Sequence, residues 1–144
     1  MMMKFPLALA LLAASLAAGE TGVVIQRPNE LDWKVSGSLP AGMATHEYHL
    51  IYEDKTTRGV QTLVRFSKGY ALPAHSHTHD EVILVLKGKI ALEAGGGSSI
   101  LGQGAYALIP GGTTHALRNA GWGPCEFLAS FAGPVDFKEL PRIK

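Results

Sequence analysis

The chain has 144 residues, of which 47% are hydrophobic and 17% are charged. This length suits a single domain with a single hydrophobic core. Its 13 basic and 12 acidic residues give a formal net charge of +1, so nothing in the composition indicates a nucleic-acid partner.

The first segment, residues 1–18, has the composition of a secretory signal peptide. Lys4 is followed by an uncharged apolar run that begins at Phe5 and ends in small residues near Ala18. This run is shorter than the roughly 20 residues that a helix needs to cross a bilayer. We therefore expect cleavage near Ala18, a periplasmic or secreted product, and no membrane attachment afterwards.

Residues 19–45 hold Pro28, Pro40 and several Gly and Ser residues without sustained periodicity, which predicts an N-terminal arm. Residues 46–144 are predicted to form the folded domain. Short runs of β type recur there, at 47–52, 60–66, 82–86, 90–93, 105–109, 115–119 and 125–131. Because Gly- and Pro-rich turns separate these runs, the pattern predicts an all-β sandwich or barrel. The tail at 135–144 could add one helical turn.

Two features concern the faces of these strands. Cys125 is the only cysteine, so no intrachain disulfide forms, and alternation places it on a buried face with Phe127 and Phe131. If Glu81 points inward, an apolar row faces outward at Val82, Leu84 and Leu86. Such a row needs a cover. We therefore predict a homodimer, with the N-terminal arm as the other way to cover the row.

Histidines are concentrated in one part of the sequence. His75, His77 and His79 lie close to Glu81, and His115 follows forty residues after the first of them. Any one of these histidines alone would be an ordinary surface or core residue. Together they indicate a metal site, because imidazole and carboxylate ligands suit divalent first-row metals.

The chain resembles the cupin superfamily, of the small single-domain conserved-barrel type, at both sequence motifs of that family. The first motif, G-x5-H-x-H-x3-E-x6-G, is matched by Gly69, His75, His77, Glu81 and Gly88. The second motif, G-x5-P-x-G-x2-H-x3-N, is matched by Gly104, Pro110, Gly112, His115 and Asn119. The resemblance implies a jelly-roll β-barrel, also called a double-stranded β-helix, of six to ten strands.

The resemblance also implies one divalent transition metal ion (Fe, Mn, Ni, Co, Cu or Zn), with the ligands His75, His77, Glu81 and His115. Asn119 is expected to be a structural residue at a strand end. For His79, direct ligation, support of a ligand and an exposed loop position all stay open. His46 and His49 precede the motifs and are predicted to be surface residues.

Cupins include oxygenases, isomerases, lyases, decarboxylases and non-catalytic binders, so the resemblance alone does not give the reaction. The preferred hypothesis is a dioxygenase-type oxidoreductase acting on a small organic substrate. A Lewis-acid isomerase or lyase acting on a sugar or small acid is the alternative, with Tyr106, Tyr48 or Glu81 as proton carrier. A module that only binds a metal or small ligand is the third. Arg65 could anchor a substrate carboxylate, although a solvent-facing side chain is the simpler interpretation.

Overall fold

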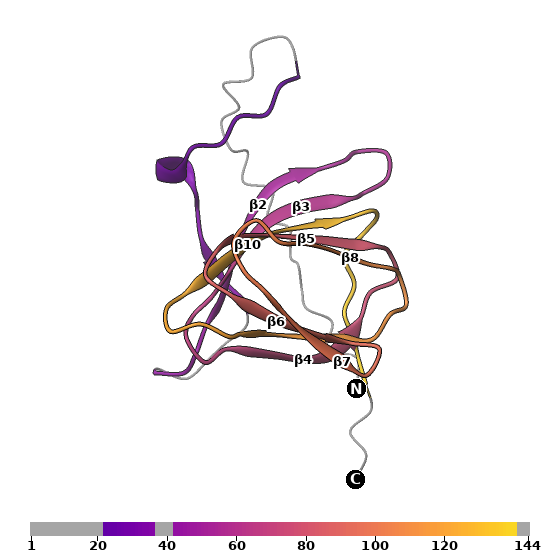
Figure 1. The fold of residues 1–144 in the computed structure, drawn as a ribbon. Helices are drawn as coiled ribbons and strands as arrows, with labels where there is room; N and C mark the ends of the chain where they lie inside the picture. Colours follow the sequence, from indigo (N-terminus) through magenta and orange to yellow (C-terminus); the bar gives the residue numbers. More distant parts are fainter. Residues whose placement is uncertain (1–21, 37–41, 141–144) are drawn as a thin grey trace.

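The computed structural model describes residues 22–36 and 42–140, so the expected signal peptide lies outside the described residues. Two antiparallel sheets stack face to face (Figure 1). The first sheet has the order β1 (Lys34–Val35), β2 (His46–Glu53), β3 (Val60–Phe66), β10 (Cys125–Phe131), β5 (Glu81–Lys87) and β8 (Tyr106–Ile109). The second has the order β11 (Lys138–Glu139), β4 (Ala71–Ser76), β9 (His115–Asn119), β6 (Ile90–Ala94) and β7 (Gly97–Leu101).

This architecture confirms the all-β jelly-roll prediction. The described helical structure is a single 3-10 turn, η1 (Pro28–Glu30), in the arm. No helix within the described ranges is long and apolar enough to span a bilayer.

Four strands were not predicted, namely β1, β4, β7 and β11, and each lacks a clear alternating pattern. β4 contains Pro73, which is accommodated at an irregularity in the pairing with β9 between Leu72 and His75. β7 begins inside the glycine-rich run, because the hairpin turn uses only Gly95 and Gly96. The predicted helical turn in the tail is wrong over its described part, since β11 lies there and pairs with β4.

The core forms as alternation on the strands predicts. Ile83 and Val85 are fully enclosed, while Val82 and Leu84 on the opposite face are partly exposed. Cys125 is buried as predicted, and burial raises the pKa of its thiol to about 11, which keeps it protonated and unreactive.

The described part of the N-terminal arm lies on β2 and β3. Strand β1 pairs with β2, and the Trp33 ring stacks 3.9 Å from the guanidinium of Arg65. His49 lies beneath the arm at 8% exposure, accepts a hydrogen bond from the Asp32 backbone N–H (2.9 Å), and contacts the Gln26 side chain through Nε2 (3.0 Å). The prediction that His49 is a surface residue is therefore wrong.

His46 is also covered rather than exposed. Its ring lies 5.1 Å from Phe66 and 5.5 Å from Tyr70, between centroids. Burial lowers the pKa of His46 to about 4, so the ring is neutral at physiological pH.

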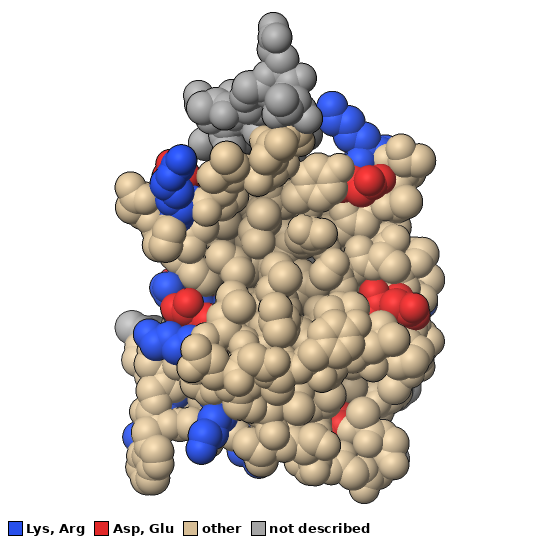
Figure 2. All heavy atoms as spheres, turned by 45° about the horizontal axis from the view of Figure 1, so that its top comes forward, with Lys and Arg blue, Asp and Glu red and all other residues tan. Residues whose placement is uncertain are grey.

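The outer face of β5 and β8 is not covered by the described part of the arm. Leu86 is 41% exposed, and Leu108 and Tyr106 on β8, which pair with Val82 and Leu84, are 54% and 61% exposed. Figure 2, which brings the top of Figure 1 forward, shows a broad area free of charged side chains with acidic and basic groups around it. The outward apolar row is thus present, and the homodimer inferred from it stays a prediction.

Candidate metal centre

Three histidines converge at one end of the barrel. His75 lies on β4, His115 lies opposite it on β9, and His77 follows β4 in the loop to β5. One nitrogen of each ring lies within 4.8 Å of the corresponding nitrogens of the other two. Their exposures are 1%, 1% and 8%, so they form a buried group of imidazoles.

Each of these rings is oriented by a backbone carbonyl at Nδ1. The acceptors are Pro73 O for His75 (2.8 Å), Thr113 O for His115 (2.9 Å) and Asp136 O for His77. A carbonyl oxygen can only accept, so each Nδ1 must carry a proton. This tautomer leaves the Nε2 lone pair available, which is the arrangement found in metal-bound histidines.

Glu81, the first residue of β5, lies beside this group. It is 3% exposed, and its Oε2 lies 3.1 Å from His115 Nε2 and 3.4 Å from His77 Nε2. Nδ1 of each ring already carries a proton, so Nε2 can donate to Glu81 only if the ring takes up a second proton. A bound cation would instead satisfy the Nε2 lone pairs and the Glu81 oxygen at the same time. The donor set therefore fits a divalent metal held by three imidazole nitrogens and one carboxylate.

The charges of the group are strongly coupled. Burial alone would raise the pKa of Glu81, but hydrogen bonds from His115 and His77 outweigh it and hold the pKa at about 2. Burial likewise disfavours the charged form of His77, but the neighbouring Glu81 carboxylate outweighs this effect, so the pKa of His77 is raised. For His75 burial dominates and lowers the pKa to about 4.

Two loops hold His77 in place. The backbone N–H of Gly112 donates to His77 O (2.8 Å), and Gly112 has φ = 80°, which explains why the second motif has glycine there. Asp80, in the same loop as His77, accepts from Gly111 N–H through Oδ1 (2.8 Å) and from Ala132 N–H through its backbone oxygen (3.0 Å).

Residues 134–139, here called the C-terminal strap, complete the centre. Asp136 contributes the carbonyl that accepts from His77, and its carboxylate accepts from the backbone (2.7 Å) and hydroxyl (2.5 Å) of Thr78. The Phe137 ring stacks on His75 at 4.2 Å and 18°. This segment was not predicted, because no residue pattern near Asp136 indicates contact with residues almost sixty positions earlier.

The structure does not bring the other candidate site residues to the centre. Tyr106 pairs in register with Leu84 on the outer face and is 61% exposed, so it cannot carry a proton at the histidines. Arg65 also faces outward, where it pairs with Glu126 (3.0 Å) and Glu47 (3.8 Å). The barrel-interior roles suggested for Tyr106 and Arg65 are thus wrong, because strand alternation turns both away.

His79 is outside the converging group. Its half-buried ring lies against the backbone of Gly133, where an added Cβ would come within 2.6 Å of the ring. Of the three roles left open, direct ligation does not fit this position. The contact with Gly133 is a packing role in the loop that was not among the three.

The sequence matches a known protein family in the region of the site. The family model described as "Cupin domain" matches residues 62–131, a stretch that includes the four candidate ligands. No curated protein matches the chain.

Solved structures share the fold. A cupin 2 conserved barrel domain protein from Rhodopseudomonas palustris is 17% identical with a TM-score of 0.67, covering 81% of this chain and 84% of its own. A predicted oxalate decarboxylase from Thermotoga maritima is 19% identical with a TM-score of 0.66, covering 76% and 97%. KdgF from Halomonas sp. is 20% identical with a TM-score of 0.59, covering 74% and 92%. The matched family model, both motifs and the shared barrel show together that this chain belongs to the cupin superfamily.

Proposed function

We propose that this chain is an exported metal-dependent enzyme that oxidises a small organic substrate with dioxygen. The observation that carries the proposal is the convergence of three buried imidazoles, each oriented through Nδ1, with the Glu81 carboxylate beside them. His75, His77, His115 and Glu81 would hold the ion. A redox-active metal bound there supplies the electrons that activate dioxygen.

The surroundings of the centre favour this chemistry over Lewis-acid catalysis. The ring neighbours of the histidines are Phe131, 5.0 Å from His77, and Phe137, which stacks on His75. Neither side chain can carry a proton. Lewis-acid isomerases and lyases need a proton carrier beside the substrate. Tyr106 lies on the outer face, and Glu81, which does lie at the centre, would be engaged as a metal ligand. An apolar lining suits the handling of dioxygen and of reactive intermediates, because it excludes water.

One observation supports the alternative of a non-catalytic binding module. All four candidate ligands are buried, and the most exposed of them, His77, is only 8% exposed. A centre this enclosed holds an ion well, and it admits a substrate only when the covering segments move.

The test begins with the metal content of tag-free protein. The metal-free protein is then reconstituted with Fe(II), Mn(II) or Zn(II) and screened against small acids, oxalate among them, in air and under nitrogen. Oxygen consumption that requires Fe(II) or Mn(II) supports the proposal. Turnover under nitrogen with Zn(II) would establish the Lewis-acid alternative, and metal binding without turnover would establish the binder.

Variants connect any activity to the centre. We expect His77→Ala and His115→Ala to lose the metal, whereas His79→Ala, a matched change in the same region, keeps it. Full metal occupancy in His77→Ala and His115→Ala would show that the ligand assignment is wrong.

A further inference from the structure

The end of the barrel opposite the metal centre has an unusual exposed side chain. Trp122, in the loop between β9 and β10, is 90% exposed, more than any other large hydrophobic residue described. Exposing a whole indole to water costs apolar burial, and Trp is a residue that proteins generally enclose. Its position therefore needs an explanation that the metal centre, at the other end of the barrel, does not give.

The loop that carries Trp122 is held firmly. Buried Asn119 donates through Nδ2 to Gly123 O (2.8 Å) and Phe66 O (3.1 Å), and its Oδ1 accepts from Gly121 N–H (2.9 Å). These bonds fix the residues on both sides of the indole. Asn119, the last residue of the second motif, thus holds the backbone of the loop that presents Trp122 to solvent, which lowers the ordering cost of binding.

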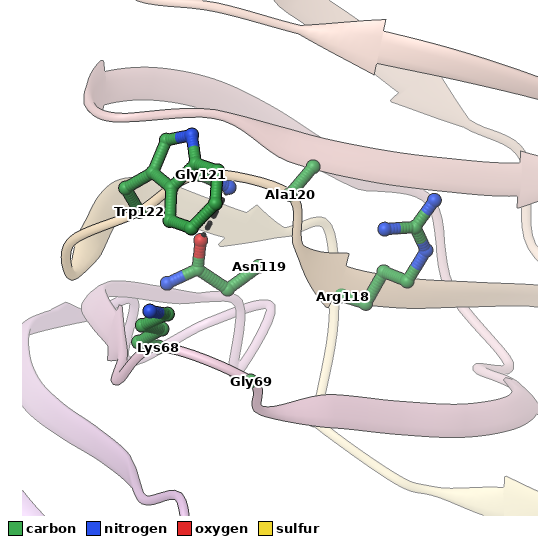
Figure 3. Close-up of a pocket in the computed structure, with 7 residues that line it drawn as sticks. All are labelled: Lys68, Gly69, Arg118, Asn119, Ala120, Gly121 and Trp122. Carbon is green, nitrogen blue, oxygen red and sulfur yellow. Dashed lines mark hydrogen bonds between the residues drawn. The ribbon is translucent and has the colours of Figure 1, made fainter.

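Two open hollows share this loop. One, of about 320 Å³, is lined by Lys68 and Arg118 together with Trp122, and Figure 3 shows the indole and Arg118 on opposite sides of Asn119. The other, of about 370 Å³, is lined by Lys87 and Lys89 together with the same Trp122. Both volumes are at the lower end of the range of roughly 300–1,000 Å³ found for small-molecule sites.

The cations around the indole have no acidic partner among the described residues, and one of them, Lys68, lies over the ring with its Nζ 4.9 Å from the ring centroid. Five basic residues of the described chain form ion pairs with acidic side chains, namely Arg27, Lys34, Arg58, Arg65 and Lys138. Of the five described basic residues without such a pair, four line the two hollows, and the fifth is Lys55. Neither hollow has an acidic lining residue. Positive charge is thus gathered at Trp122 although the chain as a whole is nearly neutral.

We propose that Trp122, with Lys68 and Arg118 in one hollow and Lys87 and Lys89 in the other, binds an acidic oligosaccharide. The C–H face of a sugar ring packs on the indole, as apolar surfaces do on aromatic rings. Carboxylate or sulfate groups of neighbouring sugars reach the cations, and Arg118 can hold a carboxylate through two parallel hydrogen bonds. Two hollows that share Trp122 suit a chain of sugars that extends past this residue.

The same features fit other anionic partners less well. Single-stranded nucleic acid is held by several aromatic side chains that stack successive bases, and the hollows have one. A membrane-inserting loop uses several large apolar side chains, whereas Trp122 lies between Gly121 and Gly123.

Calorimetric titration with defined probes tests the proposal. We expect tetragalacturonate or a heparin tetrasaccharide to bind, with weaker affinity at higher salt, and neutral cellotetraose to bind on the order of tenfold more weakly or not at all. Trp122→Ala and the double variant Lys68→Ala/Arg118→Ala each weaken binding on the order of tenfold. Controls are Ile100→Ala, an exposed apolar residue on β7, and Lys55→Ala, and both bind as the unmodified chain does.

Several results would overturn the proposal. They are equal affinity for cellotetraose, unchanged binding in both site variants, or no binding of either acidic probe by correctly folded protein. Binding only to phosphatidylglycerol vesicles or to oligothymidylate would replace it with a membrane or nucleic-acid surface. The test does not depend on the metal, so His77→Ala binds the acidic probes normally.

Discussion

Replacing Asp136 with alanine tests whether the C-terminal strap supports the metal centre. The change removes two acceptors for Thr78, at 2.7 and 2.5 Å, and an ion pair with Lys138 at 3.5 Å. Hydrogen bonds of this kind contribute about 0.5–1.5 kcal/mol each, and an exposed ion pair contributes about 0–1 kcal/mol. A total loss of about 1–4 kcal/mol is therefore expected in the contact between the strap and the His77 loop.

Because the strap also supplies the carbonyl that orients His77, this loss reaches the metal. We expect the dissociation constant for Co(II) or Zn(II), measured by calorimetry on metal-free protein, to rise about tenfold. This is at the low end of the effect seen when a partner of a metal ligand is removed. The affinity should recover in part in Asp136→Asn, which keeps an acceptor for the Thr78 N–H.

The chain contains a matched control in Asp54, whose carboxylate accepts from the backbone of Thr56 (2.8 Å) and Thr57 (2.7 Å) in the β2–β3 turn. Asp54→Ala should leave metal affinity unchanged. If Asp136→Ala also binds metal with unchanged affinity, the strap does not position His77 and the reasoning is refuted.

Three other measurements address the rest of the molecule. Burial holds the pKa of His46 at about 4, against 6.5 in the unfolded chain. Between these two values the unfolded chain binds a proton that the folded chain does not. The free energy of unfolding therefore falls as the pH drops from 6.5 towards 4. This contribution, at most about 3 kcal/mol, should be missing in His46→Phe when urea unfolding of the two metal-free proteins is compared across that range. Asn119→Ala loses three hydrogen bonds. It should lower the free energy of unfolding by about 3 kcal/mol and leave metal affinity unchanged. A loss below about 1 kcal/mol would contradict the role of Asn119 in holding the Trp122 loop. We propose that the uncovered face of β5 and β8 pairs with a second copy of the chain, so sedimentation should show a dimer that Leu108→Glu dissociates, and a monomer at micromolar concentration would end that proposal.

Much of the fold was predictable because most strands have the simple alternation that one buried face imposes. β10 is an example, with buried residues at every second position, and β5 follows the same pattern from Glu81 to Val85. β4 and β7 were missed because Pro73 and the glycine-rich run interrupt the pattern. Their strand conformation depends on pairing with β9 and β6, which is a property of the whole sheet.

The sequence by itself determined the cupin motifs and the four candidate metal ligands, because a fixed spacing on adjoining strands and loops brings those residues together. Only the tertiary structure decided that Tyr106 and Arg65 face outward, since their direction depends on the register of pairing across the sheet. Tertiary structure likewise placed Asp136 and Phe137 over the histidines and gathered four cations around Trp122. The physical reason is the same in each case: these contacts join segments far apart in the chain, and no local pattern of residues encodes them.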